Sequence, residues 1–278
     1  MSIASTVLMC HAPIVIPVVA GRRAALVQKS TMAMQEVANH IVSVKPDFLV
    51  VVSPHTPRIE NFFGLLSGPK LEGDLSGFGF PELKVELPSD NIRGHLLDCV
   101  SKSAGAKLLS LPRMPLDHGA LVPLFFMHMA GWRGQTAVVS LPFSPTAEEC
   151  LAMGEVITAA SERASERQRR WAVIASGDMS HRLTQSSPAG YHKRAHEFDE
   201  FFRDRIRAGK FHEAINVDPE LRELAGEDVV DSVAVAAASV GFEAVGNKVL
   251  SYEGPFGVGY LVAVLNTDER MHERTKSS

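Results

Sequence analysis

Residues 48–55 read Phe-Leu-Val-Val-Val-Ser-Pro-His and describe a short apolar strand that ends beside a histidine. Five consecutive apolar residues, three of them valine, are typical of a strand buried on both faces of a sheet. Ser53 and Pro54 end the apolar run, and Pro57 prevents its continuation as a helix. We therefore expect His55 just past the carboxyl end of a central strand, where open α/β sheets bind ligands. Taken alone, the stretch fits an ordinary loop histidine equally well.

The same arrangement occurs earlier in the chain. Ser5–Cys10 is a short apolar segment, and it is followed at once by His11 and then by Pro13. Between the two strands, Gln28–Val44 carries apolar residues at the spacing of an amphipathic helix that packs on a sheet. Strand, helix and strand in this order predict a parallel crossover connection. Such a crossover would bring His11 and His55 to the same edge of the sheet.

Two more histidines follow predicted strands. His118 comes after the segment Ala106–Leu111, and His181 comes after the buried segment Trp171–Ala175. If these strands are parallel, four histidines converge at one sheet edge, which suggests a metal site with proton-transfer groups. Two histidines and one carboxylate leave open metal positions for substrate and oxygen, as in non-haem ferrous oxygenases. The other two histidines would serve as acid and base, because imidazole titrates near neutral pH.

The remaining pattern favours one α/β domain, with a central, mostly parallel β-sheet and helices on both faces, over residues 1–268. Residues 269–278 are polar and are expected to be a frayed tail. Residues 60–82 are rich in glycine and phenylalanine, which predicts either a long functional lid or a loop held by ordinary aromatic packing. Other helices are expected at residues 91–104, 121–129, 147–163, 191–206, 211–215, 219–225 and 229–240, and other strands at residues 136–141, 248–252 and 258–265.

Composition excludes several classes of partner. The formal net charge is -4 and there is no long basic run, so neither nucleic acid nor an anionic membrane is expected as a partner. No apolar run approaches the roughly 18 residues that a membrane helix needs. The positive charges Arg22 and Arg23 follow the apolar segment Val7–Ala20, whereas a signal peptide carries its positive charges before the apolar region. The three cysteines have no metal or disulfide spacing, so we expect a reducing cytoplasm.

Four motifs carry a resemblance to a known family. Together and in order, they resemble the catalytic B subunit of class III extradiol ring-cleavage dioxygenases, a LigB-like superfamily. The motifs are Cys10-His11-Ala12-Pro13, Ser53-Pro54-His55-Thr56-Pro57, Leu116-Asp117-His118-Gly119 and Gly177-Asp178-Met179-Ser180-His181-Arg182-Leu183. The segment Ser251–Tyr260 is similar to a less characterised branch near the Memo-like proteins.

The resemblance implies an iron site. His11 and His55 match the two iron-binding histidines of the family. The third ligand in active dioxygenases is a glutamate at the start of a late helix, and Glu227 fits that place. Asp228 is one residue further along and is an alternative, and Glu253 is a second alternative because its loop also follows a strand.

The resemblance also assigns proton-transfer roles. His118 and His181 match the acid and base histidines of the family, one deprotonating a bound catechol and the other donating a proton during ring opening. Residues 225–230 lack the aromatic-containing helix start of the well-studied dioxygenases, and Memo-like relatives carry a cysteine in this region.

The resulting expectation is an Fe(II)-dependent extradiol dioxygenase without an organic cofactor. Its substrates would be O₂ and a small aromatic compound, either a catechol or an aminophenol. The resemblance leaves a Memo-like metal-binding or interaction protein without dioxygenase activity as the alternative, and a zinc hydrolase as a weaker one, since zinc accepts the same ligands. A homo-oligomer or a separate small subunit is expected to complete the assembly.

Overall fold

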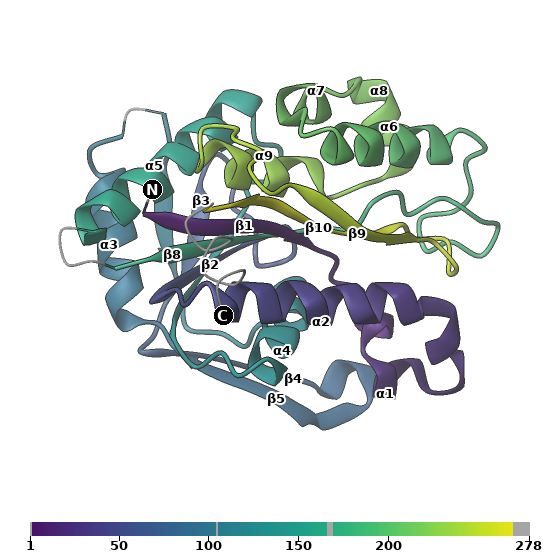
Figure 1. Cartoon of the computed structure of the whole chain (residues 1–278), viewed down its shortest axis with the longest axis horizontal. Coiled ribbons are helices and arrows are strands. Elements are labelled where there is room, and N and C mark those ends of the chain that lie inside the picture. The colour runs from purple at the N-terminus through teal and green to yellow at the C-terminus, as the bar shows by residue number, and fades with distance from the viewer. Residues whose placement is uncertain (1, 104, 166–168, 269–278) are drawn as a thin grey trace, which may run out of the picture.

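An eight-stranded mixed β-sheet forms the centre of the chain, with helices on both faces (Figure 1). The computed structural model describes residues 2–103, 105–165 and 169–268, and the tail expected at residues 269–278 lies outside them. The strands are β1 (Ile3–Met9), β2 (Phe48–Ser53), β3 (Phe63–Leu66), β4 (Lys70–Leu75), β5 (Phe80–Pro88), β6 (Leu108–Leu111), β7 (Gln135–Ser140), β8 (Trp171–Ser176), β9 (Lys248–Glu253) and β10 (Tyr260–Thr267). The α-helices are α1 (Pro17–Ala20), α2 (Gln28–Ser43), α3 (Asp90–Val100), α4 (His118–Met129), α5 (Ala147–Ser165), α6 (Ala195–Arg207), α7 (Phe211–Ile215), α8 (Pro219–Ala225) and α9 (Val230–Ala238). Short 3₁₀ helices are η1 (Pro13–Val15), η2 (Gly21–Val27) and η3 (Ser76–Phe78).

The strand order of the large sheet is β6-β3-β7-β2-β8-β1-β10-β9. Strands β7, β2, β8 and β1 are parallel neighbours, and β10 and β9 continue the sheet in antiparallel pairs. On the other side, β3 pairs with β7 in the antiparallel direction and with β6 in the parallel direction. The sequence-based prediction of an α/β fold with a mostly parallel sheet is confirmed. Because β1, β2 and β8 run the same way, their carboxyl ends meet at one edge of the sheet.

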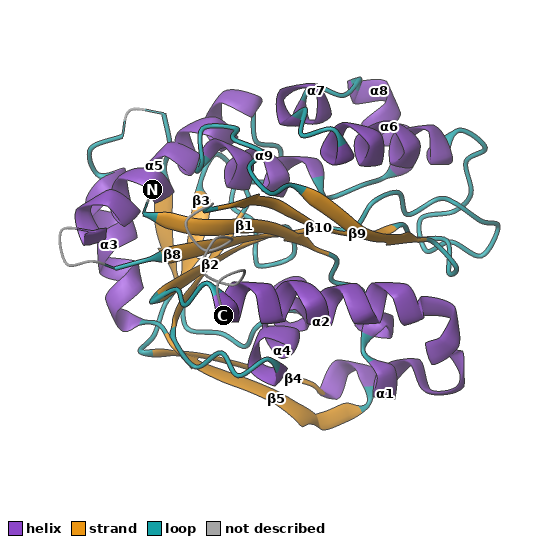
Figure 2. Ribbon diagram, viewed as in Figure 1, coloured by secondary structure: helices purple, strands orange, loops and turns teal. Residues whose placement is uncertain are grey.

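The apolar composition of the central strands explains why they lie in the middle of the sheet. Every residue of β1, β2 and β8 is buried, as the continuous apolar runs predict for strands that are covered on both faces. Helices α2 and α4 contact one face, and α9, backed by α5, contacts the other, as Figure 2 shows. Within the part of the chain that the structure describes, no helix is long and apolar enough to span a bilayer.

The glycine-rich segment 60–82 differs from the expected loop. It contains β3 and β4, and β4 pairs with β5 to form a separate two-stranded antiparallel hairpin. Leu71 and Leu75 are buried on one face of β4, an alternation that is typical of a half-buried strand. Gly73 is required because a Cβ atom there would lie 2.8 Å from the Cβ of Leu116. The loop prediction is therefore wrong, because much of the segment forms strands, and Gly73 allows the hairpin to pack closely on the segment before α4.

Candidate metal and proton-transfer site

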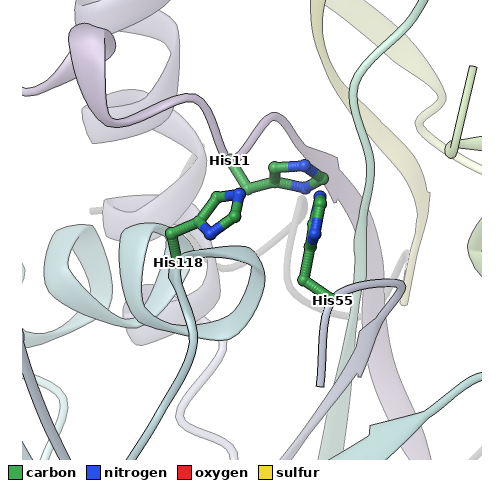
Figure 3. Close-up of side chains that lie close together, drawn as sticks. All are labelled: His11, His55 and His118. Atoms are coloured by element: carbon green, nitrogen blue, oxygen red, sulfur yellow. The ribbon is translucent and has the colours of Figure 1, made fainter. Parts of the chain in front are cut away.

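Three histidines meet where the central strands end (Figure 3). His11 follows β1, His55 follows β2, and His118 is the first residue of α4. The ring centroids of His55 and His118 are 4.2 Å apart, those of His11 and His55 4.6 Å, and those of His11 and His118 5.6 Å. One ring nitrogen of each lies within 4.8 Å of those of the other two. The structure thus brings together three of the four histidines that the sequence singles out.

The ring of His11 is held in one orientation. Its Nδ1 atom lies 3.0 Å from the hydroxyl of Ser176, and that hydroxyl donates to the carbonyl oxygen of Gly119 at 2.5 Å. Because the serine proton is used in this way, Nδ1 of His11 donates to Ser176. The backbone N–H of His11 also donates to Oδ1 of Asp178 at 3.0 Å. Nε2 of His11 is buried without a hydrogen-bond partner. A buried imidazole nitrogen in this condition is suited to ligating a metal ion.

Asp228 supplies a carboxylate to the same point. Its Oδ2 atom lies 3.1 Å from Nε2 of His55 and 3.4 Å from Nε2 of His11. Its other oxygen, Oδ1, accepts the backbone N–H of Asp178 at 2.7 Å, which fixes the direction of the carboxylate. Two imidazole nitrogens and one carboxylate oxygen therefore face one another. This donor set fits Fe(II), and also zinc and other divalent first-row metals.

The structure does not bring Glu227 to the histidines. Oε1 of Glu227 accepts a hydrogen bond from Nε of Arg222 at 2.6 Å, and Oε2 accepts the backbone N–H groups of residues 229 and 230. The carboxylate thus caps the first turn of α9, where the helix dipole favours a negative charge. Glu253 is also engaged elsewhere, because its Oε2 accepts both the backbone N–H and the hydroxyl of Ser30 at 2.8 Å.

Charge determines the protonation of the site. Burial alone would lower the pKa of His11, but the carboxylates of Asp178 and Asp228 outweigh it and raise that pKa to about 9. Burial opposes ionisation of Asp228 as well, yet the charge of His11 and the close approach of the His11 and His55 imidazoles to its carboxylate hold its pKa well below the ordinary value. Without a metal, a positive charge is therefore stabilised between these groups. A divalent cation would take the place of that charge.

His118 has the opposite electrostatic environment. Burial, followed by the charges of His55 and His11, lowers the pKa of His118 to about 4. The imidazole is therefore neutral at pH 7 and can accept a proton. A neutral histidine next to the point where His11, His55 and Asp228 meet can accept a hydrogen bond from a hydroxyl held there, which is the position that a general base requires.

The entry to α4 connects His55 and His118. Asp117 caps the helix, with Oδ1 accepting the backbone N–H of residue 120 at 3.2 Å. Its Oδ2 atom accepts the hydroxyl of Thr56 at 2.5 Å, which ties the loop after β2 to the helix. Gly119 allows this close packing, since a Cβ atom there would lie 2.9 Å from the Cβ of His55. The motif around His118 therefore holds the loop after β2 against the start of α4, and it also supplies His118 to the site.

His181 lies beside this group but is not part of it. It follows β8 in the loop that leads to α6, and its backbone N–H donates to the carbonyl oxygen of Ala225 at 2.9 Å. Nδ1 of His181 is buried without a hydrogen-bond partner. Burial raises the pKa of Asp178, and the charge of His11, followed by the repulsion of Asp228 and the nearby His181, modifies that rise.

Sequence reasoning assigned no role to Ser176 and Asp178. Both occur in the segment that was noted for His181, and both bond to His11 instead. Polar residues directly after a buried strand were the signal that could have identified them. Their partner, however, is set by the pairing of β8 with β1, which spacing in the sequence does not show.

Comparisons with known proteins show what the chain is similar to. Residues 5–263 match the family model described as the catalytic LigB subunit of aromatic ring-opening dioxygenase. A relative from Clostridium acetobutylicum, Protein CA_C1420, is 27% identical, and the match covers 95% of this chain and 58% of that protein. The present chain therefore spans little more than half the length of that relative. A crystal structure of an uncharacterized protein, JW3007 from Escherichia coli K12, has a TM-score of 0.62 at 15% identity, covering 95% of this chain and all of that one. This structural likeness shows a shared fold.

Proposed function

The chain belongs to the family of catalytic LigB subunits of aromatic ring-opening dioxygenases, and from this we propose that it is a ferrous extradiol dioxygenase. Its substrates are O₂ and a catechol or an aminophenol, and it needs no organic cofactor. The observation that supports this most strongly is the meeting of His11, His55 and Asp228 around a buried imidazole nitrogen that lacks a partner.

We assign the ligands as His11, His55 and Asp228. The assignment of Asp228 instead of Glu227 rests on the distances of 3.1 and 3.4 Å to the two histidines and on the use of Glu227 as a helix cap. Fe(II) bound there would supply a single centre at which the two substrate oxygens and O₂ are held together. Ser176 keeps Nε2 of His11 directed at that centre.

The two remaining histidines move protons. His118, neutral at pH 7, accepts a proton from a hydroxyl of the arriving substrate, so that the substrate binds as an anion. His181, whose buried Nδ1 has no hydrogen-bond partner, donates a proton at a later stage of ring opening. The family match favours this enzyme over a Memo-like protein without dioxygenase activity.

The test is an anaerobic reconstitution. The purified protein is loaded with Fe(II), mixed with a panel of catechols and exposed to O₂, while yellow ring-opened products and oxygen uptake are followed. His55→Ala and Asp228→Asn are expected to lose both iron and ring cleavage. Glu227→Gln is the matched control, because the neighbouring carboxylate is neutralised, and it is expected to retain iron.

Two results would contradict the proposal. Oxygen uptake that does not depend on His55 would exclude the proposed centre. Loss of iron in Glu227→Gln together with retention of iron in Asp228→Asn would reverse the assignment of the carboxylate ligand. Iron content is measured separately from activity, so an inactive but loaded protein would be recognised.

A further inference from the structure

The tip of the β4–β5 hairpin places an aromatic ring against the site. Phe78 lies in η3, between the two strands, and its ring contacts that of His118 edge to face, with centroids 5.9 Å apart and an angle of 70°. The residue is nevertheless 45% exposed. One side of the phenylalanine thus faces a histidine of the site while much of the ring remains open.

The base of the hairpin is fixed to the segment that leads to His118. The backbone N–H of Leu116 donates to the carbonyl oxygen of Glu72 at 2.8 Å, and Gly73 lies directly against Leu116. Leu71 and Leu75 anchor the same strand in the core. The hairpin and the start of α4 therefore form one unit, so the placement of Phe78 relative to His118 follows from the packing of the hairpin.

The tip itself has room to adjust. Gly77 and Gly79 flank Phe78, and a Cβ atom at either would meet nothing within 4 Å. Gly79 has a φ of +87°, a conformation that favours glycine. Oδ1 of Asp74 accepts the backbone N–H of Ser76 and fixes only the start of the turn. A ring carried on such a tip can settle onto a bound ligand while its base stays in place.

We propose that Phe78 is a specificity-determining residue that packs on the aromatic ring of the substrate. This inference rests on the proposed function, and it adds the residue that contacts the aromatic ring of the substrate. Isolated exposed apolar residues are common on proteins, but the ring of Phe78 contacts a histidine of the site. Aromatic pairs attract at centroid separations of about 4.5–7 Å, and Phe78 is 5.9 Å from the ring of His118. An aromatic ring held beside His118 would then pack on Phe78, and an aliphatic chelator would gain nothing from Phe78.

Ligand binding tests this directly. The Fe(II)-loaded protein is titrated without O₂ with 4-nitrocatechol, followed by absorbance, and with acetohydroxamate, a chelator that has two oxygens and no ring. Phe78→Ala is expected to weaken 4-nitrocatechol binding roughly tenfold and to leave acetohydroxamate binding unchanged. Phe78→Tyr is expected to restore the affinity for 4-nitrocatechol. In turnover, Phe78→Ala raises KM more than it lowers kcat.

Phe62→Ala is the matched control. Phe62 is 36% exposed, and its ring lies 5.9 Å from Nζ of Lys107. Unchanged nitrocatechol affinity in this control supports the assignment to Phe78. An equal loss in both variants, equal weakening of both chelators by Phe78→Ala, or no loss at all would overturn the inference.

The titration also separates this inference from the proposed activity. Binding is measured without turnover. Absence of ring-opened products would therefore refute the dioxygenase activity, while the role of Phe78 would still be decided by the 4-nitrocatechol affinities of Phe78→Ala and the unaltered protein. Absence of any 4-nitrocatechol binding to the unaltered protein would overturn both.

Discussion

Replacement of Asp199 by asparagine should remove a pH dependence from the stability of the protein. Asp199 lies in α6 and is 1% exposed. Its Oδ1 atom accepts the backbone N–H of Ser180 at 2.8 Å, and Oδ2 accepts the hydroxyl of Tyr252 at 2.6 Å. Burial raises the pKa of Asp199 to about 6, and the two hydrogen bonds offset only part of that rise.

The magnitude follows from the difference between the folded and unfolded states. An ordinary aspartate has a pKa of 3.8, so the folded protein binds this proton more tightly than the unfolded chain does. Below pH 4 both states are protonated and Asp199 adds no pH-dependent cost. Between pH 4 and 6 the unfolded chain releases the proton first, and the free energy of unfolding falls. Above pH 6 the full cost is present, which amounts to about 3 kcal/mol.

Urea denaturation at pH 4, 5, 6 and 7, in the presence of a chelator, measures this effect. Between pH 4 and 7 the free energy of unfolding of the unaltered protein should fall by about 3 kcal/mol more than that of Asp199→Asn. Asp204→Asn is the control on the same helix, since Asp204 is exposed and pairs with Arg203 and Arg207. Parallel pH profiles for the unaltered protein and Asp199→Asn would refute the reasoning.

Three further outcomes are expected at the site. Ser176→Ala removes the acceptor of His11 Nδ1 and should weaken Fe(II) affinity by about 10- to 100-fold, measured by competition with a coloured chelator; unchanged affinity would show that the hydroxyl does not orient the ring. Gly119→Ala places a Cβ atom 2.7 Å from Oγ of Ser53 and should cost about 1–3 kcal/mol in urea denaturation, whereas wild-type stability would mean that the loop after β2 yields freely. Fe(II) at 100 times its dissociation constant should stabilise the folded protein by about 2.7 kcal/mol, and a similar gain in His55→Ala would place the metal elsewhere.

Much of the fold could be predicted because its signals are local. The apolar run before His55, the similar segment before His11 and the helix between them are sufficient to predict a parallel crossover, and the structure has β1, α2 and β2 in these places. The convergence of His11 and His55 follows from that topology, because carboxyl ends of parallel strands share one edge. The place of His118 does not, since β6 is parallel to β3, and β3 is antiparallel to β7. The predicted helices at residues 211–215 and 219–225 coincide with α7 and α8.

The choice between adjacent carboxylates could not be made in this way. Glu227 and Asp228 are neighbours in sequence, yet one caps α9 and pairs with Arg222 while the other faces the histidines. The direction of each is set by the backbone at the start of α9 and by the N–H of Asp178, which comes from a different strand end. Similarly, the hairpin of β4 and β5 depends on how closely Gly73 approaches a distant segment, which periodicity does not reveal.

The position of β1 in the sheet has a consequence for how the protein folds. It is synthesised long before its two neighbours, β8 and β10, which lie more than 150 residues further along the sequence. During translation, β1 therefore has no partner strand until β8 and β10 have been synthesised. Until then its apolar residues are exposed to solvent or covered by other proteins. Pairings over such long separations make folding slow. The order of synthesis also delays the metal centre, because Asp228 is synthesised long after His11.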